Sequence, residues 1–151
     1  MTDCISHLGI LTDGLAVLQK TTLTKRMQNV PYLIQEQSLN SVRIYWLDRD
    51  KAIKALRERA EECLRANKDI REIILFGSLA EGRAVPGSDA DILIILKKSK
   101  TAFLERIESL LNHFSGLGIG VEGFPYTLEE TEDNPLACQA KKTGLPLAKR
   151  P

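Results

Sequence analysis

The sequence predicts an α/β (α+β) domain with a mixed central sheet and flanking helices. Two apolar runs rich in β-branched residues, Ile70–Phe76 and Ile92–Leu96, predict two core strands, and residues 119–126 predict a third. A full amphipathic helix is expected between the second and third strands, which makes that pair parallel through a crossover. The connection between the first two strands holds no such helix, so we expect these strands to be antiparallel.

Composition limits the class of protein before any motif is considered. The chain has 151 residues, enough for one compact domain, and 21 basic against 20 acidic residues give no general field for a nucleic-acid backbone. Its 3 cysteines are widely spaced and form no CxxC pair, which argues against a disulfide framework or a zinc site and favours a reducing cytoplasm. No apolar run nears the roughly 20 residues that cross a bilayer, and no signal segment is expected.

The N-terminal third of the chain has weaker patterns. Residues 1–47 are predicted to be a helical extension or docking arm, separate from a domain at 48–151. Leucines recur at helical spacing from Ile5 to Leu18, but glycines interrupt them. Residues 19–41 are expected to be a connector with one further short helix.

The run VRIYWL, Val42–Leu47, closes this extension. It predicts a short strand or an extended docking segment. Core packing is the favoured interpretation of its Trp46 and Tyr45, ahead of a ligand cage.

Two long helices are predicted by apolar periodicity. The first, capped by Asp48 or Asp50, places these side chains on one face: Ile53, Leu56, Ala60, Cys63 and Leu64. The second, capped by Ser99 or Thr101 and ended by Gly116, carries a stripe of Phe103, Leu104, Ile107, Leu110, Leu111 and Phe114.

The C-terminal part predicts two further helical segments. Thr127–Glu130 has the spacing of a capping box, so a helix is expected to begin there. Residues 135–142 are predicted to be helical, with Gly144 as the stop.

Two aspartates, Asp89 and Asp91, open the second core strand with one residue between them. A period of two points both carboxylates to the same side, and anions so close repel each other unless a cation lies between them. Carboxylates without imidazole or thiolate suit Mg²⁺, or Mn²⁺, and Glu122 offers a third such ligand at the same sheet edge. The alternative, favoured for SDAD taken alone, is a polar turn at Ser88 followed by a solvated edge residue.

A Gly-Ser pair ends the first core strand at the same predicted edge. Gly77 allows a sharp turn and close approach of a ligand, and the next amides are expected to open a short helix that attracts phosphate. Ser78 adds a hydroxyl, Arg83 lies in reach of a triphosphate, and Ser88 completes the candidate nucleotide-binding set. The alternative for Gly77-Ser78 alone is an ordinary turn with a serine cap, and for Arg83 a solvated side chain.

The joint pattern is more specific than its parts. Gly77-Ser78, ten residues and then Asp89-Ala-Asp91 resembles the GSx10DxD signature of the DNA polymerase β-like nucleotidyltransferase superfamily, and is most similar to the minimal nucleotidyltransferases (MNT domains) that partner HEPN proteins. The resemblance spans about residues 48–145. It implies the polymerase β-like fold, a nucleoside triphosphate bound with magnesium, and nucleotidyl transfer with release of pyrophosphate.

The same resemblance assigns roles to residues. Gly77 and Ser78 match the phosphate-binding turn, Asp89 and Asp91 match the metal ligands, and Glu122 lies where the family usually places a third aspartate. Glutamate there is a departure, because its longer side chain sets the base that deprotonates the acceptor differently.

The expected function is transfer of AMP from ATP to a hydroxyl of a partner protein, by resemblance a HEPN-type toxin. We expect the residues after Glu130 to be too few to form a helical domain that holds an acceptor. The acceptor hydroxyl is therefore expected to belong to another protein. The alternative is a non-catalytic module that neutralises its partner by binding, with a vestigial nucleotide site. Small-molecule modification is disfavoured, and a homo-oligomer is left open.

Overall fold

The computed structural model describes residues 33–151, which form one compact unit. The predicted helix between Ile5 and Leu18 lies outside the described residues. Within the described part of the chain, no helix is both long enough and apolar enough to span a membrane.

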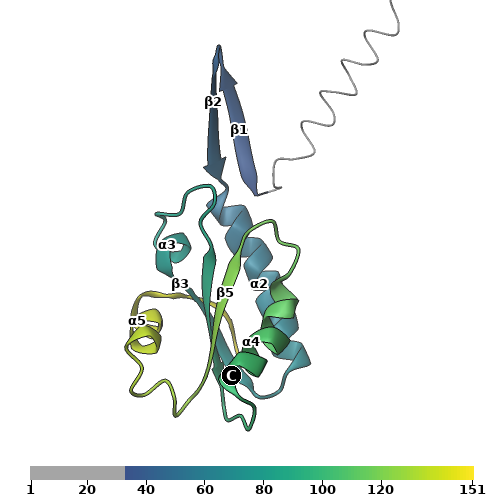
Figure 1. The fold of residues 1–151 in the computed structure, drawn as a ribbon, viewed down its shortest axis with the longest axis vertical. Helices are drawn as coiled ribbons and strands as arrows, with labels where there is room; N and C mark the ends of the chain where they lie inside the picture. The colour runs from purple at the N-terminus through teal and green to yellow at the C-terminus, as the bar shows by residue number, and fades with distance from the viewer. Residues whose placement is uncertain (1–32) are drawn as a thin grey trace, which may run out of the picture. The chain divides into compact units, whose positions relative to one another are not determined.

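The described chain begins with a pair of strands, after which helices and strands alternate (Figure 1). In order they are β1 Ile34–Leu39, β2 Val42–Leu47, α2 Arg49–Ala66, β3 Ile70–Phe76, α3 Gly77–Ala80, β4 Ala90–Leu96, α4 Phe103–Leu111, the 3-10 turn η1 Asn112–Phe114, β5 Val121–Thr127, α5 Pro135–Thr143 and β6 Leu145–Lys149.

The central sheet has four strands in the order β5-β4-β3-β6. As predicted, β3 and β4 are antiparallel, and β4 and β5 are parallel because α4 carries the crossover between them. Strand β6 was not expected; it pairs antiparallel with β3 at the far edge of the sheet. The mixed sheet flanked by helices confirms the predicted fold class.

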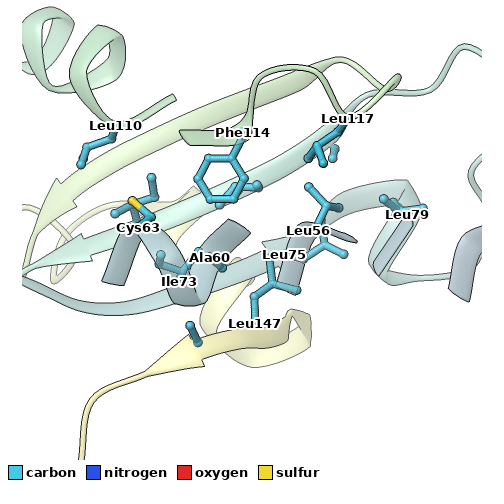
Figure 2. Close-up of a cluster of buried hydrophobic side chains, with 14 of the residues drawn as sticks. Leu56, Ala60, Cys63, Ile73, Leu75, Leu79, Leu110, Phe114, Leu117 and Leu147 are labelled. Atoms are coloured by element: carbon cyan, nitrogen blue, oxygen red, sulfur yellow. The ribbon is translucent and has the colours of Figure 1, made fainter. Parts of the chain in front are cut away.

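Helices cover both faces of this sheet (Figure 1). On one face, α2 and α4 enclose the larger core, and Figure 2 shows Leu56 and Cys63 of α2 among Ile73 and Leu75 of β3. On the other face, α5 packs its alanines on a smaller cluster that includes Leu93. Strand β4 is therefore buried on both sides, as its continuous apolar run predicts.

Helix α2 begins where its sequence predicts. The side chain of Asp48 accepts a hydrogen bond from the backbone N–H of Lys51 at 3.1 Å, which satisfies one of the unpaired amides of the first turn. Leu56, Ala60 and Cys63 from the predicted face are buried.

Helix α4 differs from its prediction at the start and along the stripe. Its N-cap is Ala102 rather than Ser99 or Thr101, because Ser99 instead accepts the backbone N–H of Thr101 in a local turn at 3.1 Å. Leu104, predicted to be buried, is 76% exposed, whereas Arg106 lies inside. The helix can turn the Arg106 side chain inward because the guanidinium pairs with a carboxylate from the segment after β5.

That partner is Glu130, and it explains why the capping box opens no helix. The box itself forms: Thr127 N–H donates to Glu130 at 2.7 Å, and Glu130 N–H donates to Thr127 Oγ1 at 3.2 Å. Arg106 then donates two hydrogen bonds to the Glu130 carboxylate, at 2.7 and 2.8 Å. The chain makes turns here, and the next helix begins later with its own N-cap, Asn134.

Residues 34–47 form a hairpin, a separate two-stranded sheet. The expected connector with a short helix is wrong for residues 34–41, which are strand and turn; Asn40 supplies the turn with φ of 54°, a value that asparagine tolerates. The predicted strand at Val42–Leu47 is confirmed. Core packing of Trp46 and Tyr45 is wrong, since they are 42% and 44% exposed.

Candidate active site at the sheet edge

Three strands bring the predicted polar residues together at one edge of the sheet. In the antiparallel pair, Asp91 lies opposite Phe76, the last residue of β3; in the parallel pair, Asp91 lies beside Glu122. Cross-strand partners share a face, so the Asp91 and Glu122 side chains lie on the α5 side of the sheet with Leu93. The predicted convergence is therefore present in the fold.

The Gly77-Ser78 turn presses directly against Asp91. Gly77 has φ of 72°, a backbone conformation that residues with a side chain rarely adopt. A Cβ built there would also overlap with Oδ2 of Asp91, so both the conformation and the available space favour glycine. Leu79 is buried and anchors the short helix α3 to the core. The turn thus places Gly77, the first residue of α3, next to the Asp91 carboxylate.

Gly120 has the same relation to Asp89, and the sequence reading missed it. A Cβ built at Gly120 would overlap with Oδ1 of Asp89. The backbone N–H of Ala90 donates to the carbonyl of Gly120 at 2.8 Å, which fixes the two segments side by side. Two glycines, Gly77 and Gly120, therefore leave the space that the aspartates occupy.

The carboxylates are electrostatically coupled. Burial raises the pKa of Asp91, and the negative charges of Glu122 and then Asp89 raise it further. Such crowding suits a divalent cation, because oxygen ligands hold Mg²⁺ while water and substrate phosphate complete its shell. Within residues 33–151, however, no three acidic, histidine or cysteine side chains form a metal cage by themselves.

Aromatic side chains form the apolar floor beside Asp91. The rings of Phe76 and Phe124 lie 5.6 Å apart at 57°, on the same face as the carboxylates. This pair was not anticipated, although the two-residue alternation from Glu122 to Phe124 carries the signal. Apolar cover on this side limits water around Asp91, in keeping with its raised pKa.

The loop between α3 and β4 holds the two remaining candidates at its surface. Arg83 donates to the carboxylate of Glu81 at 2.9 Å, and the Ser88 hydroxyl accepts the backbone N–H of Val85 at 3.0 Å. The backbone N–H of Arg83 donates to the Ser78 carbonyl at 2.9 Å, which ties this loop to the Gly77-Ser78 turn. Nucleotide contacts by Arg83 and Ser88 stay a prediction.

Arg49 is a second residue that the sequence reading missed. Its guanidinium donates to the carbonyls of Leu79 and Ala80, at 2.9 and 2.7 Å, and so occupies the C-terminal end of α3. A cation at this end also suits the helix dipole. The first residue of α2 therefore holds the helix that follows Gly77-Ser78.

Comparisons with known proteins agree with this fold. The model of the nucleotidyltransferase domain family matches residues 56–133, slightly more than half of the chain. A candidate nucleotidyltransferase from Sulfolobus solfataricus shares the fold, with a TM-score of 0.54, 22% identity, and coverage of 68% of this chain and 84% of that one.

A toxin–antitoxin structure solved with AMP-PNP is a more distant likeness in shape. Its TM-score is 0.40 at 25% identity, over 69% of this chain and 75% of that one. A search of curated proteins gave no significant match.

Proposed function

This chain belongs to the nucleotidyltransferase domain family, and we propose that it moves AMP from ATP to a hydroxyl group of a partner protein. The observation that carries the proposal is the edge where Gly77 touches Asp91 and Asp91 lies beside Glu122. A phosphate-binding turn and clustered carboxylates on one rim are what phosphoryl chemistry needs, since the protein contributes mainly positioning and electrostatics.

Asp89, Asp91 and Glu122 would hold the divalent cation, Mg²⁺ or Mn²⁺. When bound, the cation offsets the charge that develops on the phosphate oxygens. The coupling of Asp91 to both other carboxylates supports this fit, since a cation relieves their mutual repulsion.

The transfer itself is an in-line displacement. The acceptor oxygen bonds to the α-phosphorus as the bond from that phosphorus to the β-phosphate oxygen breaks, and pyrophosphate leaves with the electron pair. One of the rim carboxylates accepts the hydroxyl proton. The amides that follow Gly77, with the Ser78 hydroxyl, orient the departing phosphates, and Arg83 and Ser88 lie in the adjoining loop.

For the acceptor we propose a HEPN-type protein, on the strength of the sequence resemblance to minimal nucleotidyltransferases. The setting is a reducing cytoplasm, in keeping with the thiols of Cys63 and Cys138. The donor is ATP.

The test is transfer of label from α-phosphate-labelled ATP, with Mg²⁺, to proteins in extract of the native cells. We expect one labelled acceptor with the wild type and none with Asp89→Ala. The control, Ser115→Ala, changes an exposed hydroxyl on the loop before β5 and should label normally.

The alternative is a binding module that neutralises its partner without chemistry. The glutamate at position 122 favours it, because the family usually has the shorter aspartate there. If Asp89→Ala neutralises a purified partner as well as the wild type does, and neither labels it, catalysis is the wrong account.

A further inference from the structure

The β1–β2 hairpin sorts its side chains onto two unlike faces. Residues in register on a two-stranded ribbon point to the same side. One side, which we call the apolar arm face, carries Gln35, Gln37, Leu39, Val42, Ile44 and Trp46. The opposite side carries the half-buried pair Ile34 and Leu47 at the base of the hairpin, and beyond it Ser38, Tyr45 and the pair Glu36 and Arg43, whose charged groups lie 3.6 Å apart.

The apolar arm face is exposed. Leu39, Val42, Ile44 and Trp46 show 52%, 57%, 44% and 42% of their surface, and no charged residue lies among them. Exposed apolar side chains gathered on one face indicate a contact surface, and an isolated two-stranded hairpin is only marginally stable in water. Something is therefore expected to pack on this face.

The hairpin is joined to the candidate active site through consecutive residues. The backbone N–H of Asp48 donates to the carbonyl of buried Leu33 at 2.8 Å, which closes the base of the hairpin. The next residue, Arg49, binds the carbonyls of Leu79 and Ala80 in the helix that begins at Gly77. The base of the hairpin thus adjoins α3, the short helix that begins at Gly77.

We propose that the apolar arm face docks the acceptor protein, which would present an uncharged, apolar patch next to its reactive hydroxyl. This inference rests on the proposed function, because it names how that acceptor is held. A nucleic acid does not fit, since a polyanion needs cationic contacts that this face lacks.

A second copy of this chain is the weaker occupant. Two hairpin faces packed on each other would offer only a handful of apolar side chains per copy, whereas a stable interface uses roughly 20–30 residues a side. An acceptor that contacts both the apolar arm face and the carboxylates of Asp89, Asp91 and Glu122 would bury a larger surface.

The test compares two full-length variants, Ile44→Thr/Trp46→Thr and Tyr45→Thr. Threonine keeps strand propensity, so the hairpin is retained. Tyr45 is the matched control because it is as exposed as Ile44, at 44%, but lies on the opposite face. Each is incubated with Mg²⁺ and α-phosphate-labelled ATP in native extract.

We expect the double variant to lower acceptor labelling about tenfold or more and Tyr45→Thr to stay within about twofold of wild type, as for loss of a central apolar anchor. Label that survives the double variant refutes the docking alone. Absence of label from every protein, with wild type included, refutes the proposed transfer.

A second readout does not depend on catalysis. The variant Ile44→4-benzoylphenylalanine is irradiated in the same extract, and its adducts are identified. An adduct with the protein that takes the label supports the proposal. An adduct within the same chain, with a second copy, or with a protein that takes no label overturns it.

Discussion

Replacing Gly120 by alanine should displace the Asp89 carboxylate, and so slow the proposed transfer, while leaving the protein folded. A Cβ at this position would overlap with Oδ1 of Asp89, and an ordinary van der Waals contact requires that oxygen to move by about 1.5 Å. The Asp89 side chain is exposed and can rotate away, so the fold should tolerate the change. The carboxylate, however, would leave its place beside Asp91.

The expected effect on the rate of transfer is much larger than the effect on the free energy of unfolding. A displacement of about 1 Å in a catalytic group costs about 10²-fold in rate. The free energy of unfolding should change by less than about 1 kcal/mol, because φ at Gly120 lies outside the left-handed region and alanine also restricts the unfolded chain.

The assay measures the initial rate of label transfer from α-phosphate-labelled ATP, with urea unfolding run on the same preparations. Ser115→Ala serves as the control within the same loop, since its hydroxyl only donates to the Asn112 carbonyl at 2.9 Å. Transfer by Gly120→Ala at the wild-type rate would refute the role of Asp89 position in the reaction.

Three further predictions follow from other contacts. Asp91→Asn should raise the free energy of unfolding at pH 7, because burial and the charge of Glu122 raise the pKa of Asp91 and so make its ionised form unfavourable in the fold. This gain should vanish as the pH falls below the pKa of Asp91, where the wild-type carboxyl is protonated. Urea unfolding of both proteins across pH measures the gain. Glu130→Gln should lower stability by about 2 kcal/mol, discounted for the partial exposure of Glu130, because it leaves buried Arg106 without its carboxylate. Arg106 lowers the pKa of Glu130 to about 2, so the wild type should lose this stabilisation as the pH falls from about 4.5 through 2, and thermal unfolding of Glu130→Gln should lack that loss. Trp46 is the sole tryptophan of the sequence, so its emission should shift to shorter wavelength when a purified acceptor binds, and an unchanged spectrum in a verified complex would contradict docking there.

Local patterns predicted strands β3, β4 and β5 of the sheet well. The apolar runs at Ile70–Phe76 and Ile92–Leu96 are buried by the fold, so their composition reflects their position. The parallel and antiparallel pairings follow from what connects the strands, which is a local property. For this reason the meeting of Asp91 with Glu122 could be expected from sequence.

Features that depend on distant partners could not be read in this way. Arg106 looks like a solvent-facing position in its helix until Glu130 reaches it from the segment after β5. Strand β6 is short, and only its pairing with β3 identifies it. Gly120 carries no motif, since its importance comes from the Asp89 carboxylate lying where a methyl group would be.

The hairpin was misread for a related reason. A run of apolar and aromatic residues such as Val42–Leu47 normally indicates packing in the protein's own interior, so Trp46 and Tyr45 were expected in the core. The pattern is equally consistent with a face turned outward to another molecule. Whether the functional boundary lies at residue 47, as the sequence predicts, stays a prediction.

Because the hairpin is a two-stranded sheet of its own, its outward side chains can vary without repacking the four strands behind it. Substitutions in the hairpin would then change which acceptor is bound, whereas substitutions at the carboxylates would change the transfer reaction. A related protein could acquire a new acceptor through changes in the hairpin alone. If the apolar arm face docks the acceptor as proposed, exchanging this hairpin between related chains would redirect the transfer to another acceptor.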